Sequence, residues 1–179
     1  FEVASGQIRP FKVLIKVPQE AEGEMIAMIF LCYKEDPDSG LNIRYGVPLY
    51  VRVKGRLRYS TQLEDIKINK KFNEETEGSS LDFAVTLQNT GNVHIKPNIA
   101  IDIYNSQGEK VKTLELIGKA PLLVSGVDKY HLIFEDFNLP KGEYKVEITV
   151  IYNHEPLREY KYFMVDESGA VRLLEAAKE

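Results

Sequence analysis

Short segments in which apolar and polar residues alternate recur along this 179-residue chain, and they constrain its fold more than any other feature. From residue 65 onward, seven of them follow one another at intervals of roughly 10 to 20 residues. An alternation with period two places every second side chain on the same face of a β-strand. Seven strands in about 100 residues are typical of an immunoglobulin-like β-sandwich. The seven segments are residues 65–72, 81–88, 98–104, 111–116, 128–135, 143–152 and 159–165.

The turns between these segments agree with such a sandwich. Residues 89–92 (NTGN) and 105–108 (NSQG) contain side chains that tolerate positive φ. In LPKGEY, residues 139–144, Tyr144 follows a glycine turn at the start of the sixth strand, where a tyrosine corner bonds back to the backbone. Val146 stands where antibody domains have a cysteine, and the chain has no tryptophan, which excludes an antibody-type domain.

The composition supports an all-β fold. Valine and isoleucine occur 15 times each and aromatic residues 18 times, against nine alanines, an inventory that favours strands over helices. A net charge of −4 argues against nucleic-acid binding. The longest uncharged apolar stretch, residues 25–33, is about half of the roughly 20 residues that a membrane-spanning helix requires. Cys32 is the one cysteine of the chain, so no intramolecular disulfide is possible. Because it lies within this apolar stretch, we expect its side chain to be buried and unreactive.

The first 59 residues carry fewer strand signals than the rest. We expect a strand at 7–18, a central strand at 25–33 that is covered on both faces, and a third extended run at 41–59. Three strands are too few for a self-sufficient sandwich, because a sheet needs a second layer to bury its apolar face. Further N-terminal residues, another chain or the second domain are therefore expected to complete this part.

The sequence thus predicts two domains of immunoglobulin-like type. An incomplete N-terminal sandwich spans residues 1–59, and a complete seven-stranded one spans residues 60–165. Residues 166–179 are expected to form a tail or a short helix with Val171 and Leu174 on one side. The chain opens on Phe1 rather than methionine, so we expect a processed product, with removal of a signal peptide as one explanation.

Four segments resemble the two-domain immunoglobulin-like proteins related to periplasmic pilus-assembly (fimbrial) chaperones. They are GQIRPFKVLIKVP at 6–18, GVPLYVRV at 46–53, NTGNVHIKP at 89–97 and LPKGEY at 139–144. The resemblance covers most of residues 5–165 and implies a pair of immunoglobulin-like sandwiches. In that family the last strand of the first domain can be lent to a client subunit, while basic cleft residues anchor the client's terminal carboxylate.

For this chain the resemblance implies a partner-binding strand that carries Val47, Leu49 and Val51. Gly46 or Pro48 stands where the family has its anchoring lysine. The implied function is that of a non-catalytic protein of the cell envelope, periplasmic or extracellular, which binds or scaffolds other proteins and is chaperone-like if it lends this strand. The expected partner is another protein or a second copy of the chain, bound through sheet edges, and no cofactor is expected.

Basic residues follow this strand at every second position. Arg52, Lys54, Arg56 and Arg58 form a ladder on one face if the strand continues, and such a row could bind a carboxylate, a phosphate or an acidic surface. The alternative is that these cations protect an exposed sheet edge from unwanted pairing. Gly55 interrupts the row.

Other patterns with chemical potential are incomplete. Asp36, Asp38 and Gly40 make up half of a calcium loop that lacks its closing glutamate. The histidines, at positions 94, 131 and 154, are too far apart in sequence to predict a metal site. Ser125 and the pair Ser79-Ser80 have no nucleophile elbow around them, so no enzyme is predicted.

The aromatic residues suggest a second function, a carbohydrate-binding accessory module of an extracellular protein. Such modules present aromatic platforms to sugars, whereas most of these aromatics, including Phe83 and Tyr144, alternate into strand interiors. The tyrosines that could face outward are Tyr50, Tyr59, Tyr104 and Tyr160.

Overall fold

The computed structural model describes residues 6–32, 44–73 and 78–174, and these fold entirely as strands, turns and loops. Ten strands in this part of the chain form three antiparallel sheets, which confirms the all-β fold class. The described residues include no helix of the length and apolarity needed to cross a membrane. Asp36, Asp38 and Gly40 lie outside the described residues.

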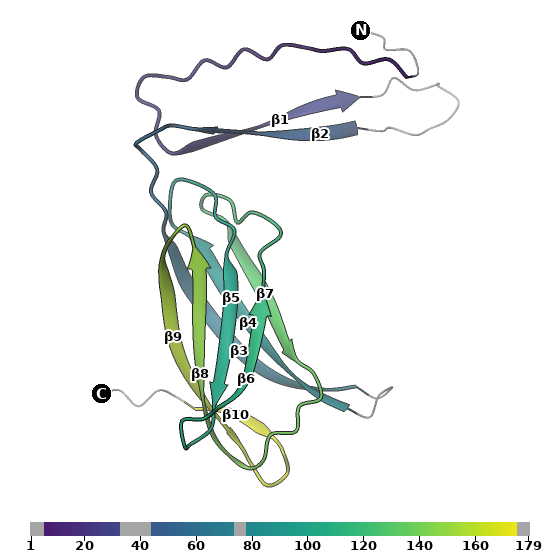
Figure 1. The fold of residues 1–179 in the computed structure, drawn as a ribbon, viewed down its shortest axis with the longest axis vertical. Helices are drawn as coiled ribbons and strands as arrows, with labels where there is room; N and C mark the ends of the chain where they lie inside the picture. The colour runs from purple at the N-terminus through teal and green to yellow at the C-terminus, as the bar shows by residue number, and fades with distance from the viewer. Residues whose placement is uncertain (1–5, 33–43, 74–77, 175–179) are drawn as a thin grey trace.

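Two of the sheets form a sandwich (Figure 1). All seven strands expected after residue 65 are present, most of them longer than expected by one to a few residues. The smaller sheet has the order β3-β4-β7, and the larger has the order β10-β9-β8-β5-β6. Their bounds are β3 (Thr61–Asn73), β4 (Gly78–Asn89), β5 (Asn98–Tyr104), β6 (Lys110–Leu116), β7 (Val127–Phe134), β8 (Gly142–Tyr152), β9 (His154–Val165) and β10 (Val171–Leu174).

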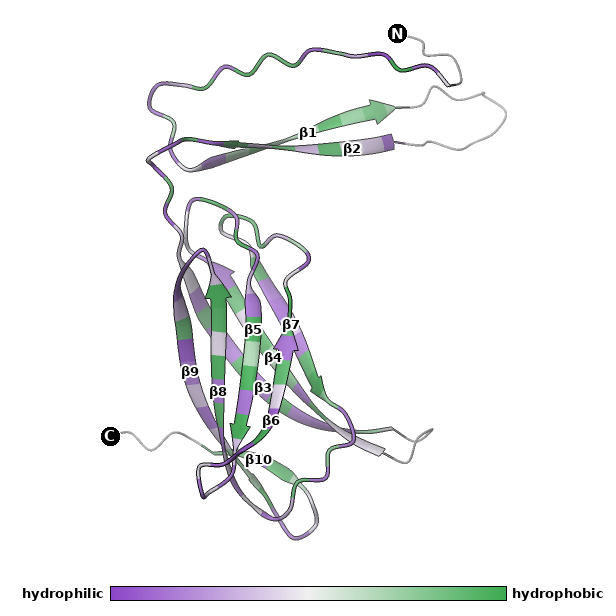
Figure 2. Ribbon diagram, in the orientation of Figure 1, coloured by the Kyte–Doolittle hydropathy of each residue, from purple (hydrophilic) through white to green (hydrophobic). Residues whose placement is uncertain are grey.

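The sandwich core lies between the two sheets and follows the period-two pattern, which Figure 2 shows as alternating colours along β8. Alternate residues of β4, β5 and β8 are fully buried, among them Phe83, Ile101 and Ile148. Phe163 from β9 stacks on Tyr144 with ring centroids 5.2 Å apart. Removing these side chains from water supplies the main stabilisation of the domain.

Two hydrogen-bonded side chains fix the loops of the sandwich. The Tyr144 hydroxyl donates to the Pro140 carbonyl oxygen at 2.8 Å, which confirms the tyrosine corner. Asn89, at the end of β4, is fully buried, and its amide donates to the carbonyl oxygens of Val93 (2.9 Å) and Leu122 (3.0 Å). Because unpaired buried carbonyls are costly, Asn89 holds the loop that follows it in one conformation.

The segment after β9 is more ordered than the sequence suggested. Val171–Leu174 forms strand β10, which pairs antiparallel with β9, so the helix considered for this region is wrong. Asp166 makes the turn that returns the chain, because its carboxylate accepts hydrogen bonds from the Ser168 and Ala170 amides at 2.9 and 3.0 Å. This local turn and the free edge of β9 outweigh the helix propensity of a few residues.

The N-terminal part is a two-stranded hairpin of β1 (Glu24–Cys32) and β2 (Arg44–Arg52) at one end of the sandwich (Figure 1). The strand expected at 7–18 is wrong, because those residues are extended but pair with no described strand. The central, covered strand expected at 25–33 is also wrong, since β1 pairs only with β2 among the described residues and much of it is exposed. Cys32 is likewise exposed rather than buried.

Candidate functional site

Apolar residues run along both strands of the hairpin, as the green segments of Figure 2 show, and the register places them on both of its faces. On one face the register places Ile26 beside Tyr50, Met28 beside Pro48, and Phe30 beside Gly46. We call this the Phe30 face, and Phe30 itself is 60% exposed. An antiparallel sheet with one solvated face normally carries polar residues there, so the Phe30 face is suited to being covered.

The opposite face carries the residues that the sequence singled out for partner binding. Val47, Leu49 and Val51 of β2 alternate along it and lie opposite Ile29, Ala27 and Met25 of β1. Val47 is exposed, whereas Leu49 and Val51 are half-buried. Sequence reasoning did not name the β1 residues of the Phe30 face, although the uninterrupted apolar run of residues 25–33 contained the signal.

Both edges of the hairpin are open in the part of the chain that the structure describes. β1 and β2 pair with each other only, so the outer edge of each strand lacks a hydrogen-bonded strand among the described residues. Such an edge presents a row of N–H and C=O groups that can template a further strand. The hairpin can therefore accept an added strand at an edge and an apolar layer on a face.

The hairpin is joined to the sandwich through Glu24, the first residue of β1, whose side chain is fully buried. The Arg52 Nε donates to one carboxylate oxygen at 2.8 Å, and the His94 Nδ1 lies 2.6 Å from the other. Burial alone raises the pKa of Glu24, but the hydrogen bonds from Arg52 and His94 outweigh it and hold the pKa below its ordinary value. Glu24 is thus a buried carboxylate kept ionised by one neighbour from the hairpin and one from the sandwich.

The hydrogen-bond pattern assigns the proton on His94. Its Nε2 lies 3.1 Å from Arg52 Nη2, which can only donate, so Nε2 accepts this hydrogen bond. Nδ1 therefore carries the proton and donates a hydrogen bond to Glu24. The ring of Tyr50 lies against the imidazole, with centroids 4.7 Å apart. Both ring nitrogens of His94 thus have a partner in the joint, Glu24 for Nδ1 and Arg52 for Nε2.

Backbone contacts around Gly23 complete the joint. The Glu24 amide donates to the Asn92 carbonyl oxygen at 2.8 Å, and the Asn92 side chain bonds the Arg56 carbonyl (2.9 Å) and the Arg58 amide (2.6 Å). Gly23 has φ +70°, and a Cβ there would collide with the Asn92 carbonyl oxygen. Only glycine fits both constraints.

The four basic residues of the predicted ladder do not line one strand, because β2 ends at Arg52 and the chain turns at Gly55, φ +81°. Arg52 belongs to the joint. Arg56 donates to the carbonyl oxygens of Gln19 (3.5 Å) and Ala21 (3.2 Å), and Arg58 bonds Asn92 through its backbone. Lys54 is exposed in the turn.

A second buried carboxylate lies on the outer side of the smaller sheet. Asp82 is bonded by Lys71 Nζ at 2.6 Å and by His131 Nδ1 at 2.9 Å, and these bonds hold its pKa below the ordinary value despite burial. No group of three metal-ligating side chains occurs within residues 6–32, 44–73 and 78–174.

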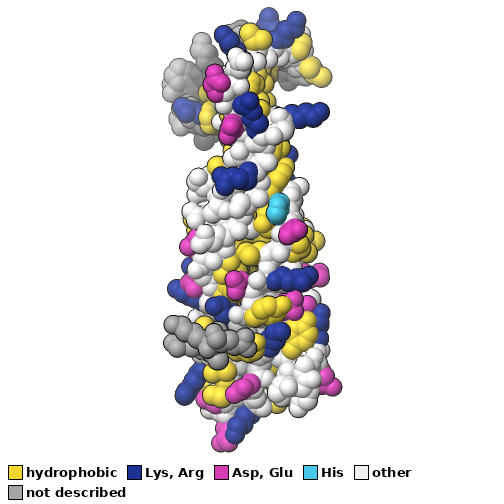
Figure 3. All heavy atoms as spheres, turned by 90° about the vertical axis from the view of Figure 1, so that its left-hand side faces the viewer, with side chains coloured by type: hydrophobic (Ala, Val, Ile, Leu, Met, Phe, Trp, Pro, Cys, Tyr) yellow, Lys and Arg dark blue, Asp and Glu magenta, His cyan; other side chains and the backbone are white. Residues whose placement is uncertain are grey.

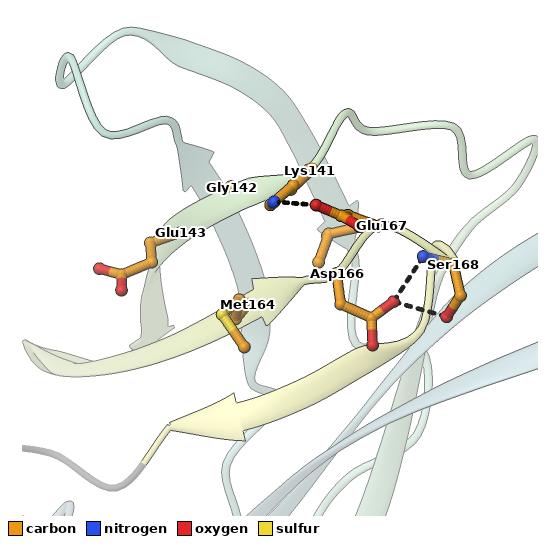
Figure 4. Close-up of a pocket in the computed structure, with 8 residues that line it drawn as sticks. Lys141, Gly142, Glu143, Met164, Asp166, Glu167 and Ser168 are labelled. Carbon is orange, nitrogen blue, oxygen red and sulfur yellow. Dashed lines mark hydrogen bonds and ion pairs between the residues drawn. The ribbon is translucent and has the colours of Figure 1, made fainter.

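A hollow of about 620 Å³ at the far end of the sandwich is lined by residues 141–143 and 164–168 (Figure 4). Four of its polar side chains are engaged in two pairs. Lys141 pairs with Glu167 at 2.5 Å, and the Ser168 hydroxyl donates to Asp166 at 2.6 Å. These contacts shape the turn into β10, so the hollow is a consequence of that turn.

The comparisons with known proteins give little. No protein-family model matches the chain, and no curated protein matches it. Two structures of Parabacteroides merdae β-glucuronidase, one with glycerol in its active site, align with TM-scores of 0.40 and 0.39 at 13% and 14% identity. Each alignment covers 74% of this chain but 16% of the glucuronidase chain.

The joint can be tested with a matched pair of glycine variants. Gly23 and Gly55 both have positive φ, so alanine at either site costs about 1–2 kcal/mol of backbone strain. Only in Gly23→Ala does the new Cβ also clash with Asn92. We therefore expect hydrogen-exchange protection of the Glu24 amide to fall at least about tenfold in that variant. Equal protection in Gly23→Ala and Gly55→Ala would show that the contact does not hold the hairpin.

The electrostatics of the joint predict an acid-sensitive contact. Because the folded-state pKa of Glu24 is depressed, its stabilisation is present above the ordinary glutamate pKa of about 4.3 and is lost as the pH falls through the folded-state value. NMR titration of the Glu24 carboxyl carbon should give a pKa below 4.3, and Arg52→Gln should raise it. Lys54→Gln is the control, since Lys54 makes no hydrogen bond to Glu24; an equal shift in both variants would contradict the assignment.

Proposed function

We propose that this chain is a non-catalytic protein-binding or scaffolding module of the cell envelope, and that its partner binds the β1–β2 hairpin. The observation that carries the proposal is a hairpin with apolar residues on both faces and open edges among the described residues. An isolated two-stranded sheet is marginal in water. Contiguous exposed apolar surface of this kind marks an interaction site.

The mode of binding that fits this surface is strand addition. A partner segment in extended conformation would pair its backbone with an open edge, while alternate apolar side chains would cover Phe30 or Val47. The segment GVPLYVRV, which resembles the client-binding strand of pilus-assembly chaperones, lies in and just beyond β2. The same resemblance supports a periplasmic or extracellular location.

The joint between the hairpin and the sandwich also supports the proposal. Glu24, Arg52 and His94 fix the root of the hairpin on the sandwich. A binding element held this way does not lose orientational freedom again when the partner binds, so less binding free energy is lost to ordering. The sandwich then serves as the support that presents the hairpin.

A charge placed on the Phe30 face should weaken binding. We expect Phe30→Asp to weaken capture of the partner from envelope extract, or self-association of the chain, at least about tenfold, because a buried phenylalanine contributes roughly 1.5–3 kcal/mol. The control is Val127→Asp on β7, whose side chain is 57% exposed on the sandwich and lies opposite Gln88. Binding is measured with purified bait and by analytical ultracentrifugation.

Both variants leave the sandwich core intact, so its thermal unfolding should be unchanged and serves as the folding control. A partner retained by Phe30→Asp, or one lost equally in Val127→Asp, would contradict hairpin binding. A chain that is monomeric and captures nothing would contradict the proposed function as a whole.

A further inference from the structure

The outer face of the larger sheet carries a hollow of about 580 Å³ that is distinct from the hairpin. The register places Tyr104 of β5 beside Lys145 of β8, and Lys145 beside Tyr162 of β9. Directly paired residues point to the same side of a sheet, so the two tyrosines flank Lys145 at a separation of about 10 Å, twice the strand spacing. They form two aromatic walls with a polar floor between them.

Tyr162 is the more accessible of the two aromatic walls. Tyr162 is 40% exposed, and its ring stacks on no other described ring. Tyr160, two residues earlier on β9, has one ring face covered by Lys145 Nζ, 4.3 Å from the centroid. Tyr104 is half-buried beside the loop of residues 105–108, which lines one end of the hollow.

The floor holds hydrogen-bonding groups that the protein does not use itself. Glu143 and Glu147 lie on β8 two residues to either side of Lys145, and neither forms an ion pair or hydrogen bond with the described residues. On the side of the sandwich that carries β9, hydrophobic side chains lie among charged ones of both signs (Figure 3). The hollow therefore offers acceptors, a donor and aromatic faces at once.

This mixture selects the class of ligand. The Lys145 ammonium, which lies against the Tyr160 ring, repels a cation, and the two glutamates repel an anion. A neutral polyol meets neither penalty, because its hydroxyl groups donate to the carboxylates and accept from the ammonium group. The C–H face of a sugar ring also suits the electron-rich face of a tyrosine.

We infer that the hollow between Tyr104 and Tyr162 binds a short neutral oligosaccharide, with sugar rings against the two tyrosines. The site lies on the sandwich and does not depend on the hairpin or its partner. Tyr104 and Tyr162 would supply the stacking surfaces, and Glu143, Lys145 and Glu147 would fix the orientation of the sugar through its hydroxyl groups.

The test is titration of the full chain with oligosaccharides of glucose, mannose and N-acetylglucosamine. Binding is monitored by isothermal titration calorimetry and by the amide NMR shifts of Lys145 and Tyr162. Tyr162→Ala should weaken binding at least about tenfold, while Tyr162→Phe, which keeps the ring, should stay within about threefold. Tyr45→Ala is the matched control, because Tyr45 is a 67% exposed strand tyrosine on the hairpin.

Glu147→Gln separates a sugar from a cationic peptide, since it keeps an acceptor and removes the charge. Neutral oligosaccharide binding should change by less than about threefold in this variant. Three outcomes would overturn the inference: no oligosaccharide shifts these amides at millimolar concentration, Tyr162→Ala and Tyr45→Ala behave alike, or an oligolysine peptide binds instead and is lost in Glu147→Gln.

Discussion

The arrangement of this molecule depends on one buried carboxylate. Glu24 opens β1, Arg52 closes β2 and His94 belongs to a loop of the sandwich, and the three side chains bond one another within 3.1 Å. Burying a charge is unfavourable unless it is paired and hydrogen-bonded, so the joint holds only when all three groups are present. A hairpin without this contact would be a marginal two-stranded sheet tethered by the residues that precede β3.

The sandwich and the hairpin differ in how completely their apolar faces are buried and their strand edges paired within the described chain. In the sandwich, both inner faces are buried, and the loops are fixed by Asn89 and by the Tyr144 corner. In the hairpin, both faces are apolar and the edges lack neighbours among the described residues. The sandwich thus resembles a support and the hairpin an unfinished sheet. This contrast is the physical reason for the proposed partner binding.

The sequence predicted the sandwich well, because period-two alternation and Gly- or Asn-containing turns are local signals. It predicted Tyr144 for the same reason. The sequence failed where hydrogen-bond pairing with another strand decides the outcome. Residues 7–18 alternate like a strand but pair with no described strand. Val171–Leu174 becomes a strand because β9 offers an edge. Nothing local links Glu24 to His94, which are 70 residues apart, and the hollow at Tyr162 needs the register of three strands.

If the Glu24 joint is intact in solution, the hairpin and the sandwich move as one body. Residual dipolar couplings of backbone amides in a weakly aligned sample can establish this, because they report the orientation of each part independently. We expect one alignment tensor to fit the amides of β1 and β2 together with those of β3 to β9. Two different tensors, with smaller couplings in the hairpin, would show that the hairpin moves independently and that the joint does not hold it.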